Sequence, residues 1–505
     1  ITVLEGLEAV RKRPGMYIGS TTVEPIVGLY DFSYREINII PGLLKIINEI
    51  IDNSVDEFIR TNGKFSTEIS VSIDQSPLEP ISVTVADNGR GMPHDLVNGI
   101  PIPVAAWTSA RSGSNFSDDR STIGMNGVGS FATAVFSTKF IGSTTNSSGK
   151  TMIVETQDNC SVVDYKTITK KSSVGTIVKF YPDLSKFGVM EFSDDHILSI
   201  KDRLLNLAIC FPGITFSFNK EKLKFKNLKD ISSRISEYAH SVEHTSGDKR
   251  IKICVTPNTE VKSSTDTSDQ FLTHSYVNGL YTRLGGTHID YISGKIISEL
   301  RALIKKKYKF DVSPAQIKSH LFLTMWITGV NNLKFDSQTK ERVTNTQTEM
   351  ASYFSDLDLD KFTKKILADE NIIMPIVEAQ IRKAELAELA EIRKKNKESD
   401  KANLRKISKF TDASEKRDRR ECMLFITEGD SANASILSAR TKLIGAFPLR
   451  GKPINALGVP TKEILQNQEM SNLFSVLGLK LGEKVKSKSD LYFGKIVLCT
   501  DADVD

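Results

Sequence analysis

Several features are scarce or absent in this chain of 505 residues. No apolar run is long enough to span a bilayer and the N-terminus has no signal-peptide pattern, so we expect no membrane partner and a cytoplasmic location. The five cysteines show no metal-like pairing, which is typical of reduced, mostly buried thiols. They are Cys160, Cys210, Cys254, Cys422 and Cys499.

The composition sets only broad limits on the fold. An apolar content of 39% over this length predicts several cores and about two to four domains. The net charge of +5 is mild and indicates a locally basic surface, not a wholly basic protein.

Acidic residues follow two apolar segments near the C-terminus. The predicted strand 423–426 ends close to Glu428, and the predicted strand 496–500 runs directly into three aspartates. The C-terminal ends of parallel strands lie at the same edge of a sheet, so these carboxylates can come together. Clustered carboxylates repel one another unless a cation neutralises their charge. Because all the ligands are oxygen atoms, Mg²⁺ is the favoured cation. An Asp-rich surface turn is the alternative for the triplet alone. The predicted metal ligands are Glu428, Asp501, Asp503 and Asp505.

This pair of acidic motifs resembles the TOPRIM domain of topoisomerases and primases. The run Pro448-Leu449-Arg450-Gly451-Lys452-Pro453 between them is similar to the type II topoisomerase version.

A second set of polar residues lies on a predicted helix over 42–60, whose apolar residues recur at helical spacing. Glu49, Asn53 and Asp56 fall at i, i+4 and i+7 on another face of this helix. Polar groups aligned on a largely apolar helix predict a site inside a cavity, and a solvated face is the alternative.

Two glycine-rich segments follow. The strand-like segment 81–86 runs into Asp87-Asn88-Gly89-Arg90-Gly91-Met92-Pro93, where a carboxylate can accept a hydrogen bond from an exocyclic amine and glycines allow a close turn. The segment 124–129 precedes an apolar helical run, so its N–H groups are suited to bind a triphosphate. It lacks the Gly-Lys-Ser/Thr of a P-loop.

Together with Gly175-Thr176 at the start of the predicted strand 177–181, these segments resemble the GHKL ATP-binding fold of gyrase, the heat-shock chaperone, histidine kinases and MutL. The resemblance implies that Glu49 is the general base, that Asn53 holds Mg²⁺, and that Asp87 binds the adenine amino group with support from Thr176. The implied ATP-binding residues are Asn53, Asp56, Asp87, Arg90, Gly91, Met92, Gly124, Met125, Asn126, Gly127, Val128, Gly129 and Thr176.

A Gln-Thr-Lys loop distinguishes among these families. Residues 335–342 resemble the loop of type II topoisomerases whose lysine touches the γ-phosphate, which implies catalytic roles for Lys340 and Gln338. The opening segment 5–19 is similar to the start of gyrase-type subunits. Segments 103–107 and 115–119 resemble the large subunit of T-even-like bacteriophage topoisomerases, and Asn126 stands where bacterial gyrase usually has His.

The resemblance implies a multidomain α/β and α+β chain. We expect a GHKL-type ATPase sandwich over 1–219, a transducer domain over 220–377, a charged helix and linker over 378–420, and a Rossmann-like TOPRIM domain over 421–505 that is incomplete. Within the transducer we expect strands near 251–255 and 273–277 and helices near 289–307 and 314–323.

The expected function is that of the ATP-hydrolysing subunit of a type II DNA topoisomerase, which passes one duplex through a Mg²⁺-dependent break in another. The implied partners are double-stranded DNA, a second copy through the ATPase domain, and a breakage-reunion domain or subunit that supplies the tyrosine. None of the twelve tyrosines here follows an arginine, as the cutting tyrosine usually does. A phage-encoded protein would act in the host cytoplasm.

Two alternatives come from other classes. The first is a non-cutting GHKL clamp of the MutL or chaperone type, against which the acidic cluster argues. The second is a histidine kinase, for which no phosphoacceptor helix is evident in the sequence.

Overall fold

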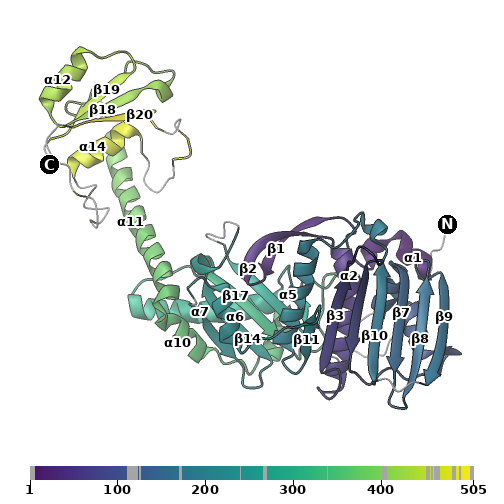
Figure 1. Ribbon diagram of the computed structural model, residues 1–505. Coiled ribbons are helices and arrows are strands. Elements are labelled where there is room, and N and C mark those ends of the chain that lie inside the picture. The colour runs from purple at the N-terminus through teal and green to yellow at the C-terminus, as the bar shows by residue number, and fades with distance from the viewer. Residues whose placement is uncertain are drawn as a thin grey trace, which may run out of the picture. The chain divides into compact units, whose positions relative to one another are not determined.

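The computed structural model describes backbone and side chains for most of the chain (Figure 1). The described residues are 6–110, 123, 127–169, 173–238, 240–264, 270–337, 339–400 (backbone alone from 388), 407–450, 455, 459, 464, 467–479, 485–487 and 491–500. The chain divides into two compact units, Ile1–Ile376 and Val377–Asp505. Each unit is described by itself.

The first unit begins with a mixed eight-stranded sheet in the order β12-β11-β3-β4-β10-β7-β8-β9. All its neighbouring strands pair antiparallel except β3 and β11. Its strands are β3 (Glu68–Asp74), β4 (Ser82–Asp87), β7 (Ser137–Thr145), β8 (Lys150–Gln157), β9 (Val162–Thr169), β10 (Gly175–Pro182), β11 (Thr215–Phe218) and β12 (Glu221–Lys222).

Helices pack on this sheet. Along β3, buried and exposed residues alternate strictly, as expected for a strand with one covered face. The helices that contact the sheet are α2 (Pro41–Arg60), α3 (Ile102–Thr108), α4 (Gly129–Val135) and α5 (Asp194–Cys210). α2 begins with Pro41, which is favoured in the first helical turn, and it buries one apolar face that includes Leu43, Ile47 and Ile51.

Smaller elements flank the sheet. The helix α1 (Gly6–Lys12) contacts α4, and a hairpin of β1 (Glu24–Tyr30) and β2 (Ser33–Ile39) contacts α5. A short hairpin of β5 (Leu96–Val97) and β6 (Ile100–Pro101) precedes α3. Single 3-10 turns lie at Pro14–Met16, Leu184–Phe187, Asn258–Glu260 and Arg419–Glu421.

A second sheet, of which β14 and β17 are labelled in Figure 1, completes the first unit. Its strand order is β13-β14-β17-β15-β16. Its strands are β13 (Val242–Thr245), β14 (Ile251–Pro257), β15 (Leu272–Val277), β16 (Leu280–Tyr281) and β17 (Leu321–Ile327). Its helices are α6 (Leu228–Ile235), α7 (Thr287–Tyr308), α8 (Pro314–Lys318), α9 (Gln347–Tyr353) and α10 (Asp360–Ala368). Buried residues of both sheets, such as Phe216 and Phe322, belong to one continuous core.

The structure corrects one predicted element. The helix expected over 314–323 ends at Lys318, and Leu321 begins the strand β17. Every residue of β17 is buried, because this strand lies in the middle of the sheet between β14 and β15. A short, continuously apolar run does not distinguish a buried strand from a buried helix.

The long helix α11 (Glu370–Asp400) begins eight residues before the charged segment expected from 378. In the second unit, three parallel strands stand in the order β19-β18-β20. They are β18 (Met423–Thr427), β19 (Ile444–Pro448) and β20 (Lys495–Cys499), accompanied by α12 (Asp430–Ser438) and α14 (Gln468–Leu477). Leu424, Phe447 and Phe493 form part of a small separate core.

The predicted domain limits stay predictions. β12 pairs with β11 in the eight-stranded sheet, so this sheet extends to Lys222, a little beyond the expected limit at 219.

Candidate functional site

The helix α2 presents three of the predicted polar residues in different surroundings. Glu49 is largely buried, with 16% of its side chain exposed. Asn53 is exposed and its Nδ2 donates to Ser130 Oγ at 2.8 Å, which leaves its Oδ1 as the atom suited to a hard cation. Asp56 is fully buried, and its Oδ1 accepts from the backbone N–H of Ile123 at 2.6 Å. Asp56 thus holds the backbone beside the predicted lid, and its contact with nucleotide stays a prediction.

Positive charges surround Glu49. Burial raises the pKa of its carboxyl group, but the nearby ammonium groups of Lys45 and Lys340 outweigh burial and lower the pKa overall. Lys45 Nζ lies 2.5 Å from Glu49 Oε1, one helical turn away. Glu49 is therefore ionised at neutral pH and able to accept a proton from water.

A second group of predicted residues meets at the end of β4. Asp87 Oδ2 accepts from Ser54 Oγ of α2 at 2.8 Å, and its Oδ1 accepts from the N–H of Gly89 at 2.8 Å. Burial raises the pKa of Asp87 in spite of these hydrogen bonds. Thr176 stands opposite Asp87 in the ladder between β10 and β4.

Hydrogen bonds hold the glycine-rich turn after β4 close to Asp87 and Thr176. The N–H of Met92 donates to Thr144 Oγ1 at 2.7 Å, and Thr144 Oγ1 lies 3.3 Å from Thr176 Oγ1. Gly91 has φ +67°, and a Cβ there would lie 2.1 Å from the carbonyl oxygen of Thr145. The turn therefore requires glycine at this position.

Arg90 points to a different partner. Its Nε donates to Glu57 Oε1 at 2.6 Å and its Nη2 donates to Glu57 Oε2 at 3.2 Å. About half of the Arg90 side chain is exposed. This surface ion pair between Arg90 and Glu57 holds the glycine-rich turn against α2.

The predicted phosphate segment is described only from Gly127 onward. Gly127 has φ +60°, Val128 is the residue before α4, and Gly129 begins that helix. A Cβ on Gly129 would lie 1.7 Å from Glu49 Oε2, so the first residue of α4 packs directly against the Glu49 carboxylate. Gly124, Met125 and Asn126 lie outside the described residues.

Lys340 of the Gln-Thr-Lys loop, which follows β17 of the five-stranded sheet, also reaches this site. Lys340 is buried and its Nζ donates to the carbonyl oxygen of Ile123 at 2.7 Å. Burial lowers the pKa of Lys340, and the positive charge of Lys45 lowers it further. Gln338 lies outside the described residues.

The structure describes only one of the four predicted acidic ligands. Glu428 is exposed and directly follows β18, whose last residue Thr427 pairs with Cys499 at the end of β20. The C-terminal ends of both strands therefore lie side by side, as a shared metal site needs. Asp501, Asp503 and Asp505 lie outside the described residues.

Three charged residues of the candidate site, Lys45, Asp52 and Arg203, were not predicted from the sequence. Lys45 could have been found from its position four residues before Glu49 on the same helix. Asp52 forms a buried ion pair with Arg203 of α5, which comes 151 residues later, and no local pattern indicates that pairing.

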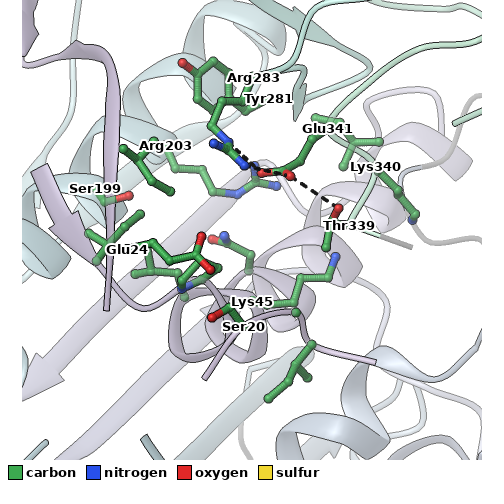
Figure 2. Close-up of a pocket in the computed structure, with 18 of the residues that line it drawn as sticks. Ser20, Glu24, Lys45, Ser199, Arg203, Tyr281, Arg283, Thr339, Lys340 and Glu341 are labelled. Atoms are coloured by element: carbon green, nitrogen blue, oxygen red, sulfur yellow. Dashed lines mark hydrogen bonds and ion pairs between the residues drawn. The ribbon is translucent and has the colours of Figure 1, made fainter. Parts of the chain in front are cut away.

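A cavity of about 340 Å³ lies beside these residues (Figure 2). Lys45, Asp52, Arg203, Lys340 and Glu341 are in its lining. Figure 2 shows Arg283 joined to Glu341, with Nε and Oε1 2.8 Å apart. The cavity therefore extends from α2 to the loop that carries Lys340.

Within the described part of the chain, no helix combines the length and apolar character needed to cross a membrane.

Comparisons with known proteins agree with this geometry. The family model described as histidine kinase-, DNA gyrase B- and HSP90-like ATPase matches residues 38–186, and the model described as DNA gyrase B matches residues 220–398. The crystal structure of the ATPase region of Saccharomyces cerevisiae topoisomerase II superposes with a TM-score of 0.65 at 25% identity, covering 75% of this chain and 98% of that one. The ATPase and transducer domains of Balamuthia mandrillaris topoisomerase II give a TM-score of 0.66 at 26% identity, covering 76% of this chain and 98% of that one. These matches confirm the expected α/β multidomain architecture with a GHKL ATPase fold.

Curated relatives extend the match. The DNA topoisomerase large subunit of Enterobacteria phage T4 is 37% identical over 492 residues, which are 96% of this chain and 90% of the relative. A probable DNA topoisomerase 2 of Dictyostelium discoideum is 31% identical over 99% of this chain, but the chain spans only 33% of that relative. The chain belongs to the family of ATP-dependent type II DNA topoisomerases, with similarity over nearly the full length of a phage large subunit.

Proposed function

We propose that this chain is the ATP-operated gate subunit of a type II topoisomerase, and that its ATP site is the one built on α2 and β4. The observation that carries this proposal is the convergence of Glu49, the start of α4 and Lys340 from three separate parts of the sequence. DNA is the substrate and dimerisation accompanies its action, as the similarity to topoisomerase large subunits implies.

Each residue has a distinct proposed role. Glu49 takes the proton from the attacking water, and Lys340 leaves the carbonyl of Ile123 to contact the γ-phosphate. Asn53 Oδ1 is suited to hold Mg²⁺, which would neutralise charge on the phosphate oxygens. Asp87 would accept a hydrogen bond from the adenine amino group, and Thr176 would support this contact. The segment 124–129 would cover the phosphates. Gln338 acts beside Lys340.

The acidic cluster has the chemistry for a second Mg²⁺ site, in a TOPRIM-like domain. Glu428, Asp501, Asp503 and Asp505 would hold the ion used in DNA cleavage. What supports this is the parallel pairing of β18 with β20, which brings Glu428 to the edge where the aspartates follow. The cutting tyrosine would come from a separate breakage-reunion subunit or domain, and the site of action would be the cytoplasm of the host.

Plasmid relaxation with Mg²⁺ and ATP tests this proposal. We expect relaxation only when the chain is combined with a tyrosine-bearing partner. Glu49→Gln should retain ATP binding but lose hydrolysis by about 10²–10⁴-fold, because the base can no longer accept a proton. The exposed Glu79→Gln is the matched control and should behave as the wild type.

Two outcomes would contradict it. ATP hydrolysis without strand passage under any pairing would favour a non-cutting clamp of the MutL or chaperone type. Unchanged hydrolysis in Glu49→Gln would remove Glu49 from the role of base.

A further inference from the structure

A buried ion pair lies beside the ATP site without a role in the reaction proposed above. Asp52 of α2 and Arg203 of α5 are joined through Asp52 Oδ1 and Arg203 Nη2, and their side chains are only 5% and 10% exposed. Figure 2 shows Arg203 among the side chains that line the cavity, which Lys45 and Lys340 line as well. Burying two charges costs free energy that their attraction often fails to recover, so such a pair is weak evidence for stability alone.

The pair is electrostatically coupled to both proposed catalytic groups. Arg203 is one of three cations, with Lys45 and Lys340, whose charge counteracts the effect of burial on the pKa of Glu49. Asp52, in turn, is one of the carboxylates that counteract the effect of burial on the pKa of Lys340. The pair therefore lies within electrostatic reach of both the general base and the lysine of the loop.

Within the described part of the chain, Lys45, Lys340 and Arg203 differ in what holds each of them near Glu49. Lys45 bonds to Glu49 itself, and Lys340 bonds to the carbonyl of Ile123, which it leaves on contacting the γ-phosphate under the proposed function. Arg203 is anchored by Asp52, so its position does not depend on the carbonyl group that holds Lys340. A fixed charge in a site of low dielectric acts strongly over short distances.

We propose that Arg203 is a positioning residue for ATP hydrolysis: anchored by Asp52, it fixes α2 against α5 and keeps a positive charge near Glu49 while Lys340 engages the phosphate. This inference rests on the proposed roles of Glu49 and Lys340. It adds Asp52 and Arg203 to the machinery as residues that act through the base.

A double replacement separates positioning from stability. Asp52→Leu and Arg203→Met each leave one buried charge unpaired, so each single variant should melt at a lower temperature than the wild type. The combined variant removes both charges and should regain most of that loss. Its kcat for ATP hydrolysis should nevertheless stay at least about tenfold below the wild type, with the KM for ATP within about twofold, because the ion pair that joins α2 to α5 and the cation near Glu49 are both gone.

Two comparison variants complete the experiment. Arg203→Lys keeps the charge and should recover part of kcat. The exposed pair Arg301 and Asp311 provides the matched control, and Arg301→Met combined with Asp311→Leu should leave both kcat and melting temperature unchanged.

Each outcome decides between the two ideas. If the double variant regains kcat together with its melting temperature, the pair is merely structural and the positioning role is wrong. If the double variant does not regain stability, Arg203→Lys still distinguishes the two ideas. A wild-type KM together with a partly recovered kcat would support the positioning role. A fall in kcat accompanied by a rise in KM would oppose it. Failure of Glu49→Gln to slow hydrolysis would instead overturn the proposed base, whatever Arg203 does.

Discussion

At the scale of single residues, sequence patterns predicted those candidate site residues that lie within one element or directly follow it. Glu49 and Asn53 share one face of a helix, and Asp87 ends a strand, so periodicity and turn chemistry were sufficient to single them out. The structure adds that Ser54 joins the helix to Asp87. Arg203 could not be found in this way, because its partner Asp52 is distant in sequence and a buried ion pair has no local signature.

Gly91 allows a prediction at this scale. Gly91→Ala forces a non-glycine residue into φ +67° and places its Cβ 2.1 Å from the carbonyl oxygen of Thr145. We expect the variant to lose about 1–3 kcal/mol of stability from overpacking, in addition to the cost of the positive φ, and to bind ATP more weakly. Urea unfolding and ATP titration measure both effects.

Gly99 provides a control for Gly91. It has φ +79°, but nothing lies within 4 Å of its added Cβ, so Gly99→Ala carries only the backbone cost. Equal losses of stability in the two variants would show that the close approach to Thr145 does not matter.

At the scale of elements, long amphipathic helices and alternating strands were predicted with nearly correct limits, since their periodicity covers many residues. The helix expected over 42–60 is Pro41–Arg60 in the structure, and the one expected over 289–307 is Thr287–Tyr308. The strand β17 was mistaken for the end of a helix. Its position in the centre of a sheet depends on β14 and β15, which lie far from it in sequence.

The burial of β17 predicts a large effect of truncation. Phe322 is completely buried and packs edge-on against Tyr34 of β2, with ring centroids 6.1 Å apart. Phe322→Ala should lower the free energy of unfolding by about 3–5 kcal/mol, because it leaves a cavity in the shared core. Leu78→Ala, at a residue that is 91% exposed, should change it by less than about 0.5 kcal/mol. A small loss for Phe322→Ala in chemical denaturation would mean that the two sheets do not share a core.

At the scale of the whole molecule, the sequence predicted two separate sites, one for ATP and one for a metal ion, and the structure divides into two compact units. The proposed ATP site lies in the first unit, since every described residue of it precedes Ile376. Glu428 lies in the second unit, with its own small core. The limits of the smaller domains within the first unit are less evident, because the apolar residues of both sheets pack into one continuous core.

This division predicts how ligands change the unfolding of the protein. A non-hydrolysable ATP analogue binds only the native first unit, so at a concentration of 100 times its Kd it should stabilise that unit by about 2.7 kcal/mol. Differential scanning calorimetry should therefore show two transitions, of which the larger moves to higher temperature with the analogue while the smaller stays in place. Glu79→Gln should preserve the shift. Asp87→Asn should reduce it, because the substitution replaces one of the two acceptor oxygens of Asp87 with an NH2 group that can only donate. A single transition that moves as a whole would mean that the two units unfold cooperatively, and nucleotide occupancy would then be linked to the stability of the acidic cluster as well.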